Sequence, residues 1–252
     1  MTGPEIAYRR QGEGPKLVLI HGYLGGSAMW EDQIAFLSRK FDIIAPDLPG
    51  FAGSSHLIAP DSIAGYSECI LEFLAQENVD DFFLLGHSMG GMIVQQMALT
   101  APARVKKLVA YGTGPVGVMP GRFETIDDSR RRLKADGLDR AAKRIAATWF
   151  IAEEAAPGYA LCSQLGAQAS MDAALSSLAA WQNWNVSKEL KNISAPTLVI
   201  WGDRDRSYGW PQPESLWRGI PDCSLAVVPG CAHNVHMEKP DLFNRIVEDF
   251  LA

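Results

Sequence analysis

The sequence contains few cysteines, and they are not spaced for metal binding or redox chemistry. Only Cys69, Cys162, Cys223 and Cys231 occur among 252 residues, and no two of them form a CxxC motif. A chain of this length can build enough hydrophobic core to be stable without disulfides. We therefore interpret all four as reduced thiols and assign none of them as a nucleophile.

Long apolar runs and long basic tracts are also absent. No apolar run approaches the roughly 18 residues needed to cross a bilayer, and the first residues do not resemble a signal peptide. The net charge of −6 argues against binding to nucleic acid or to a membrane surface. The sequence thus predicts a cytoplasmic protein. The basic cluster from Ser129 to Arg132 is interpreted as a solvated helix face, with a contact to an anionic substrate or partner as the alternative.

The chain does contain short β-branched runs, and these alternate with longer segments of helical pattern. This alternation is typical of an α/β protein, with a mostly parallel twisted sheet flanked by helices. Strands are predicted at residues 16–20, 41–47, 81–87, 105–112, 195–202 and 223–230, and an earlier strand at 6–10. Helices are predicted at residues 29–37, 62–76, 91–100, 213–217 and 240–251.

The alternation breaks between about Pro115 and Ser187, where only helical patterns such as 139–150 and 171–182 occur. We predict a core domain of residues 1–114 and 188–252 and an inserted helical cap of residues 115–187. Aromatic residues of the cap either pack it onto the sheet or line an apolar pocket. They are Trp149, Phe150, Tyr159, Trp181 and Trp184.

A GxSxG motif, Gly86-His87-Ser88-Met89-Gly90, lies where an apolar run ends and a helical pattern begins. A serine on such a sharp turn is exposed to solvent at the edge of a sheet, and flanking glycines let the backbone pass closely. The motif predicts Ser88 as a nucleophile.

A serine hydroxyl needs a base and an acid that orients the base. His233 follows the last predicted strand and is the predicted base, whereas His236 is interpreted as a loop histidine. Spacing does not separate Asp203 from Asp205, but Asp205 lies deeper in its loop and is favoured as the acid. His233, His236 and Glu238 lack the HExxH spacing of a metal site, so no metal is expected.

An oxyanion hole needs two backbone N–H donors. The first is predicted at Met89, and the second at Tyr23 in the loop HGYLGG, with Leu24 as the alternative. His21 is expected to hold this loop by hydrogen bonding.

The motifs HGYLGG, DLPGFAGSS, GHSMGG, GDRD and GCAHNVHMEKP occur in this order, and the chain resembles the α/β-hydrolase superfamily. This resemblance implies a Ser88, Asp205 and His233 triad, an oxyanion hole from Tyr23 and Met89, a lid and no cofactor. Fragments such as AMWEDQI and GHSMGGMIVQQMA are most similar to the 3-oxoadipate enol-lactonase group.

The resulting prediction is a serine hydrolase that cleaves a carboxylic ester or lactone of a small to medium apolar or aromatic substrate. Substrate contacts are expected from Leu24, His87, Trp149, Phe150, Trp181 and Trp184. One alternative is a carbon–carbon hydrolase of meta-cleavage products, which shares the DLPGF loop but usually has an Asn where this chain has His87. The other is a non-hydrolytic member of the same fold that binds a ligand.

Overall fold

The apolar runs form a seven-stranded sheet in the order β1-β3-β2-β4-β5-β6-β7. The computed structural model describes residues 5–118 and 121–252, so residues 1–4 of the predicted core and 119–120 of the predicted cap lie outside the described residues. β1 is antiparallel to β3, and the other pairings are parallel, which confirms the predicted fold class. The strands are β1 Tyr8–Gln11, β2 Lys16–Ile20, β3 Asp42–Pro46, β4 Phe82–His87, β5 Val105–Tyr111, β6 Thr197–Gly202 and β7 Cys223–Val228.

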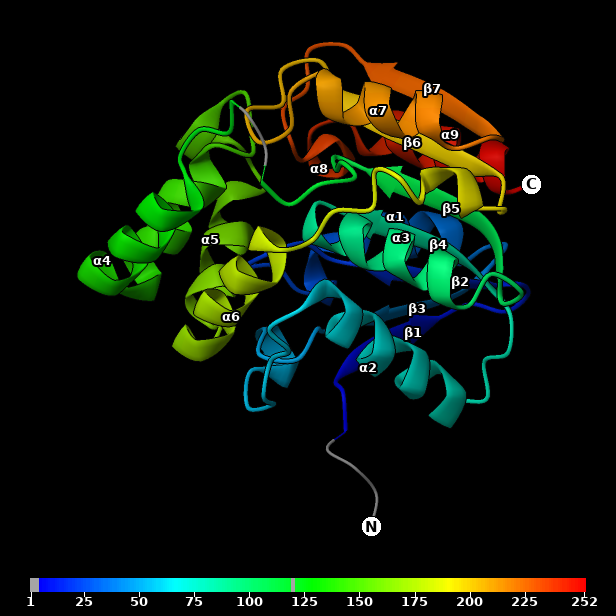
Figure 1. Ribbon diagram of the computed structural model, residues 1–252, viewed down its shortest axis with the longest axis horizontal. Coiled ribbons are helices and arrows are strands. Elements are labelled where there is room, and N and C mark those ends of the chain that lie inside the picture. The colour runs from blue at the N-terminus through cyan, green and yellow to red at the C-terminus, as the bar shows by residue number, and fades with distance from the viewer. Residues whose placement is uncertain (1–4, 119–120) are drawn as a thin grey trace.

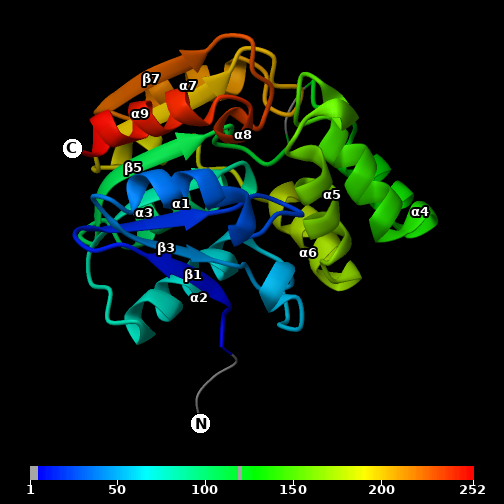
Figure 2. The ribbon, with the colours of Figure 1, turned by 180° about the vertical axis from the view of Figure 1, so that it is seen from behind.

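Helices cover both faces of the sheet because successive side chains of a strand point to opposite faces. In β2, Val18 and Ile20 belong to one core cluster, whereas Leu17 and Leu19 belong to the other. Helices α2, α3 and α7 lie on the first face (Figure 1), and α1, α8 and α9 lie on the second (Figure 2). These helices are α1 Glu31–Leu37, α2 Ile63–Gln76, α3 Met89–Thr100, α7 Pro211–Gly219, α8 Val235–Glu238 and α9 Pro240–Leu251.

Three predicted helix starts were wrong by two residues each, and one of them is that of α7, which begins at Pro211 instead of residue 213. Residues 27–30 form a separate 3₁₀ turn, so α1 begins at Glu31. In contrast, α3 already begins at Met89, directly after Ser88. The low helix propensity of Gly90 and Gly91 hides this start in the sequence, but the tight strand-to-helix turn requires glycine there.

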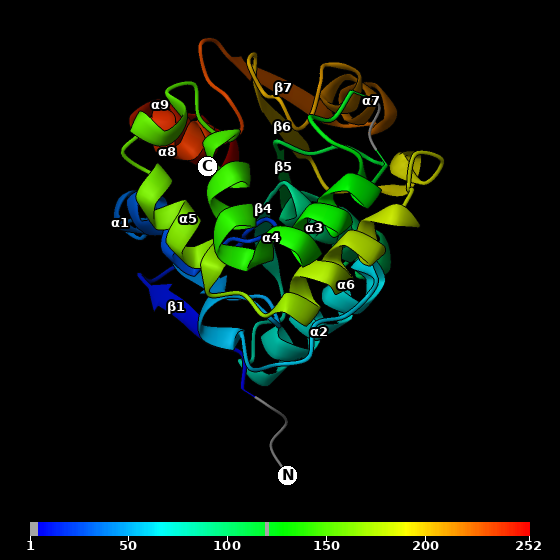
Figure 3. The same ribbon diagram turned by 90° about the vertical axis from the view of Figure 1, so that its left-hand side faces the viewer.

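Three further helices, α4 Ile126–Ala147, α5 Tyr159–Ala167 and α6 Met171–Gln182, lie across one end of the sheet (Figure 3). Hydrogen bonds from Gly117 N to Trp184 O and from Val186 N to Pro115 O, both 2.9 Å, join the segments that enter and leave this helical insertion. These bonds support the predicted boundaries at 115 and 187, which remain a prediction of domain organisation.

The predicted helix at 139–150 ends early, at Ala147. The Thr148 side chain donates to the Ile145 carbonyl at 2.7 Å and caps the helix, so the chain turns inward at Trp149. Within α4, Gly137 has a φ of 77°, which kinks the helix.

Among the described residues, no helix is both long and apolar enough to span a membrane.

The parallel strands point toward the helical insertion (Figure 1), and their carboxyl ends lie close to one another in register. Ile20 is level with Gly86, His87 with Tyr111, and Tyr111 with Ile200. The loops that follow these strands, and the loop after β7, therefore meet at one edge of the sheet. This is the edge where α/β proteins bind their ligands.

Candidate active site

Ser88 lies on a strained turn between β4 and α3, with φ 58° and ψ −119°. A side chain at Gly86 would place its Cβ 2.2 Å from the Gly90 carbonyl oxygen, so only glycine permits this tight turn. The turn is tied to β5, because Ser88 N donates to the Tyr111 carbonyl at 3.0 Å and the Thr113 hydroxyl donates to the Ser88 carbonyl at 2.9 Å. The fold therefore holds a serine in a conformation that is costly for a non-glycine residue.

His233 and Asp205 form a buried pair beside this turn. The distance between His233 Nδ1 and Asp205 Oδ2 is 2.8 Å, and the two side chains are 2% and 0% exposed. A carboxylate only accepts hydrogen bonds, so Nδ1 carries the proton and Nε2 is left as the acceptor. Ser88 and His233 line the same cavity.

The two candidate acids have different partners. Asp205 uses Oδ2 for His233, while its Oδ1 accepts from the backbone N–H groups of Ser207 at 2.7 Å and Tyr208 at 3.1 Å. Asp203 instead accepts from Gly230 N at 2.7 Å and joins the β6 and β7 loops. The structure thus brings Asp205, and not Asp203, to the predicted base.

Neutral polar groups fix the backbone of His233. Its carbonyl accepts from the Tyr111 hydroxyl at 2.7 Å and from His87 Nε2 at 3.2 Å. Burial, followed by the nearby charge of His233, lowers the pKa of His236 to about 3 and lowers the pKa of His87 as well. Both rings therefore stay neutral at physiological pH and do not oppose a proton on His233.

His236 and Glu238 have hydrogen-bond partners that spacing alone does not reveal. His236 Nδ1 lies 3.0 Å from the Tyr111 hydroxyl, and both Glu238 oxygens accept from backbone N–H groups. Among residues 5–118 and 121–252, no group of three or more His, Cys, Asp or Glu side chains is placed to hold a metal ion.

Glu238 connects the His233 loop to the helical insertion. Its Oε2 accepts from Ala232 N and its Oε1 from Ile151 N, both at 2.7 Å. Asn234 N adds a bond of 3.0 Å to the Trp149 carbonyl. The base is therefore positioned from the sheet side and from the insertion side.

The loop after β2 lies against the nucleophile. A Cβ at Gly22 would lie 2.9 Å from the Ser88 Cβ, and Leu24 has a φ of 54°, which turns the chain sharply. His21 was predicted to hold this loop by hydrogen bonding. Its Nδ1 lies 2.8 Å from the Gly22 carbonyl, and its Nε2 accepts from Leu48 N at 2.9 Å. No hydrogen bond joins the N–H of Tyr23 or Met89 to another described residue.

The cavity at Ser88 is small and enclosed by aromatic groups. Its volume is about 20 Å³, which is space for roughly one water molecule. Of the predicted substrate contacts, Trp149 and Trp181 line it, together with Tyr23 from the oxyanion loop. The structure places the other four, Leu24, His87, Phe150 and Trp184, away from the cavity wall.

A family model described as the alpha/beta hydrolase fold matches residues 15–240. The chain belongs to the α/β-hydrolase family. This confirms the resemblance inferred from the motifs, and it assigns the chain to the hydrolases of this fold.

Relatives of this α/β hydrolase are named for different substrates. It is 28% identical to the 2-hydroxy-6-oxo-6-phenylhexa-2,4-dienoate hydrolase of Burkholderia cepacia, over 96% of this chain and 89% of the relative. It is 26% identical to the monoacylglycerol lipase ABHD6 of Homo sapiens, over 96% of this chain and 77% of the relative. The crystal structure of the enol-lactonase from Burkholderia xenovorans LB400 superimposes with a TM-score of 0.90, covering 98% of this chain and 96% of that one, but its 22% identity shows the fold alone.

Sequence reasoning missed several residues that line the cavity of this hydrolase. Tyr208 stacks on the His233 ring, with centroids 5.6 Å apart and an interplanar angle of 9°. Burial raises the pKa of the Tyr208 hydroxyl, and hydrogen bonding to Ser88 acts in the opposite direction. The position of Tyr208 in the Asp205 loop was its only signal. The others are Arg122, Phe123, Ile145 and Ser207, which no motif marks.

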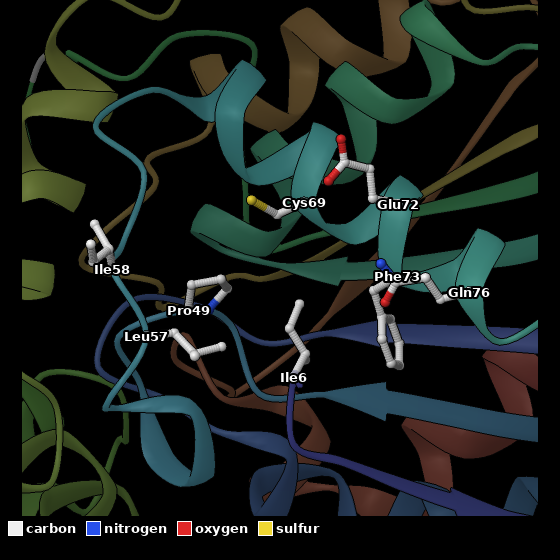
Figure 4. Close-up of a pocket in the computed structure, with 8 residues that line it drawn as sticks. All are labelled: Ile6, Pro49, Leu57, Ile58, Cys69, Glu72, Phe73 and Gln76. Atoms are coloured by element: carbon white, nitrogen blue, oxygen red, sulfur yellow. The ribbon is translucent and has the colours of Figure 1, made fainter. Parts of the chain in front are cut away.

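A wider hollow of the hydrolase lies elsewhere, between α2 and the segments around Ile6 and Leu57 (Figure 4). Its polar groups are Cys69, Glu72 and Gln76 of α2, and none of the three triad candidates lines it. Burial raises the pKa of the Cys69 thiol, so this cysteine is a poor nucleophile.

Proposed function

We propose that this hydrolase cleaves a carboxylic ester or lactone through an acyl-enzyme on Ser88. The observation that carries the proposal is the His233–Asp205 pair, buried with a Nδ1–Oδ2 distance of 2.8 Å on the cavity that Ser88 also lines. A serine on a strained turn, a histidine base and a carboxylate that orients the base are the three parts that acyl transfer requires.

In the first step, the Ser88 oxygen attacks the substrate carbonyl while His233 Nε2 takes the serine proton. Asp205 stabilises the imidazolium that forms, because its Oδ2 accepts the Nδ1 hydrogen bond. The Ser207 and Tyr208 N–H groups hold the other Asp205 oxygen, so the carboxylate does not rotate away from His233.

The attack creates a tetrahedral intermediate with a negative oxygen. In our proposal the N–H groups of Met89 and Tyr23 donate to this oxygen, and each such donor stabilises the transition state by roughly 2.7 to 4 kcal/mol. The close approach of Gly22 to Ser88 supports this placement of the loop.

The intermediate then collapses. His233 gives its proton to the departing alkoxide, which leaves as an alcohol, or as the tethered hydroxyl of an opened lactone. Water attacks the acyl-enzyme with His233 again as the base, and the carboxylic acid is released. No metal or organic cofactor is needed in these steps.

A fluorophosphonate probe tests the nucleophile without assuming the substrate. We expect a single adduct on Ser88 in a peptide mass spectrum and none in Ser88→Ala. Hydrolysis of p-nitrophenyl esters by the unmodified protein, and its loss in Ser88→Ala, would extend the result to turnover. A folded protein that gives no adduct and no turnover would contradict the proposal and favour a non-hydrolytic member that binds a ligand.

Carbon–carbon bond hydrolysis of a dienoate ketone is the second candidate. The similarity to the Burkholderia cepacia dienoate hydrolase over 96% of the chain favours it. Side-by-side assays with lactones, aryl esters and a dienoate ketone separate the two activities. A kcat/KM for the ketone well above that for any ester would replace the ester proposal.

The cytoplasmic location also remains a prediction.

A further inference from the structure

Arg122 is a cation in the wall of the candidate active site. It lines the cavity with Ser88 and His233, and it is the one Arg or Lys among the described residues that do so. It also lines the neighbouring outer hollow, which has a volume of about 210 Å³ and is lined by Val118 and Gln182 as well as by the acidic residues Glu124 and Asp127. Arg122 thus lies between the reacting serine and a larger space at the surface.

The charge of Arg122 has no ionic partner among residues 5–118 and 121–252. Its Nη1 donates to the Glu124 carbonyl at 3.0 Å and to the Ser129 hydroxyl at 3.1 Å, which are both uncharged acceptors. The Glu124 carboxylate is engaged elsewhere, by Arg144 Nη1 at 2.7 Å and by the Ser129 hydroxyl at 2.6 Å. Burial lowers the pKa of the Arg122 guanidinium, which remains charged at physiological pH.

Aromatic rings hold the guanidinium in place. Its Cζ lies 4.6 Å from the Phe123 ring centroid and 5.3 Å from that of Trp181. Such stacking restricts a flexible side chain before any ligand arrives.

Trp181 supplies a second unused donor at the same place. It also lines the cavity, it is 4% exposed, and its buried indole Nε1 has no hydrogen-bond partner among the described residues. Leaving a buried donor unpaired costs about 1 to 3 kcal/mol, so an acceptor at this position is favourable. The Arg122 guanidinium offers a planar fork of donors that suits a carboxylate, and the unpaired indole N–H is a further donor on a residue of the same cavity wall.

We propose that Arg122 and Trp181 bind a carboxylate group of the substrate, so that the molecule cleaved at Ser88 is an ester or lactone that also carries a free carboxylate. The inference rests on the proposed function for the reacting ester, but binding of the carboxylate does not require catalysis. The basic cluster of α4 is a poorer anion site, because Arg130 and Arg131 already pair with Asp127 and Asp128 at 3.2 and 2.5 Å.

The first test compares two esters that differ in one charge, p-nitrophenyl hydrogen adipate and p-nitrophenyl methyl adipate. We expect the wild-type protein to have the higher kcat/KM for the charged ester. In Arg122→Gln the ratio of the two kcat/KM values should fall about ten- to hundredfold, as expected for a lost hydrogen-bonded charge. Trp181→Phe, which keeps the ring and loses the N–H, should lower the ratio less.

Arg140→Gln is the matched control, because Arg140 is exposed on α4, lines neither hollow and changes the net charge equally. The ratio of kcat/KM for the charged ester to that for the uncharged ester should be the same in Arg140→Gln as in the wild type. If Ser88-dependent turnover occurs but the ratio is unaffected in Arg122→Gln, the carboxylate proposal is wrong while the hydrolase proposal stands.

The second test measures binding without catalysis. Isothermal titration of Ser88→Ala with succinate, adipate and suberate should detect at least one dicarboxylate, and Arg122→Gln in the same background should weaken it about ten- to hundredfold. Equal binding by the Arg122→Gln and Arg140→Gln forms, or no binding by any form, would overturn the proposal. This result is informative even if no ester is hydrolysed.

Discussion

The strand-end loops and the helical insertion line the same cavity, but they are held in different ways. Around Ser88 and His233, backbone groups are hydrogen-bonded to neighbouring strands and to buried side chains. The first half of α4, in contrast, lies above a kink at Gly137 and carries exposed ion pairs, which typically contribute at most about 1 kcal/mol each. The comparison teaches that the candidate triad is held mainly from the sheet side, whereas in our proposal the insertion supplies side chains that select the substrate.

The largest effect is expected from the nucleophile itself. Ser88→Ala should lower kcat for ester hydrolysis by about five to six orders of magnitude, because the covalent route is lost. The far-ultraviolet circular dichroism spectrum should not change, since alanine replaces one small side chain. Steady-state kinetics measures this loss. If Ser88→Ala kept more than a small fraction of the activity, the strand-end loops would not carry the nucleophile.

The next largest effect should separate the two loop carboxylates. Asp205→Asn should lower kcat by about three to four orders of magnitude, since the amide no longer orients and stabilises the protonated base. Asp203→Asn should lower it far less, because Asp203 bonds the backbone of Gly230 and not His233. A larger loss in Asp203→Asn, measured with the same ester, would reverse the assignment of the acid.

Tyr208 tests how far the positioning of the base extends beyond the triad. Tyr208→Phe keeps the ring stacked on His233 but removes the hydroxyl near Ser88, so we expect kcat to fall by about one order of magnitude with little change in KM. An unchanged kcat would show that the hydroxyl has no part in the reaction. Tyr208→Leu, which also removes the stacking, should be more damaging.

The smallest effect concerns stability. The pKa of His236 is lowered to about 3 by burial, so the unfolded chain binds a proton that the folded chain rejects between about pH 6.5 and 3. The stabilisation is fully present above pH 6.5 and is lost as the pH falls, by up to about 1.4 kcal/mol per pH unit for each such histidine. His21 and His87 act in the same direction.

Urea unfolding at pH 7 and pH 5 measures this effect. His236→Gln should reduce the difference in the free energy of unfolding between the two pH values, while the exposed His56→Gln should leave it as in the wild type. An undiminished difference in His236→Gln would mean that His236 is not kept neutral by the fold.

The sheet and the loops of the candidate site could be predicted from the sequence, because short local patterns of residues indicate them. An apolar run ends at His87, directly before Ser88, and the spacing of Gly86 and Gly90 reflects a turn that admits no side chain. The partners of Asp203 and Asp205, however, depend on where the β7 loop lies, and spacing does not contain that information. Structure was needed to bring Asp205 to His233.

The insertion was harder to interpret because one helical pattern serves both packing and binding. Trp149 and Trp181 line the cavity while Phe150 and Trp184 do not, although all four share the same residue class and burial. Arg122 lies in an irregular segment that has no period, so nothing in the sequence distinguished it from a surface arginine. Only the tertiary structure shows that Arg122 lines the same cavity as Ser88.

Glu238 forms a connection between the helical insertion and the His233 loop that lies far from the two chain junctions. The insertion is attached to the rest of the chain at the crossing of residues 115–117 with 184–186, and again where Ile151 N donates to the Glu238 carboxylate. A chimeric protein that receives the insertion of a relative must therefore reproduce this distant N–H donor as well as the two chain crossings. A graft designed only from the two junctions would leave the His233 loop without one of its supports.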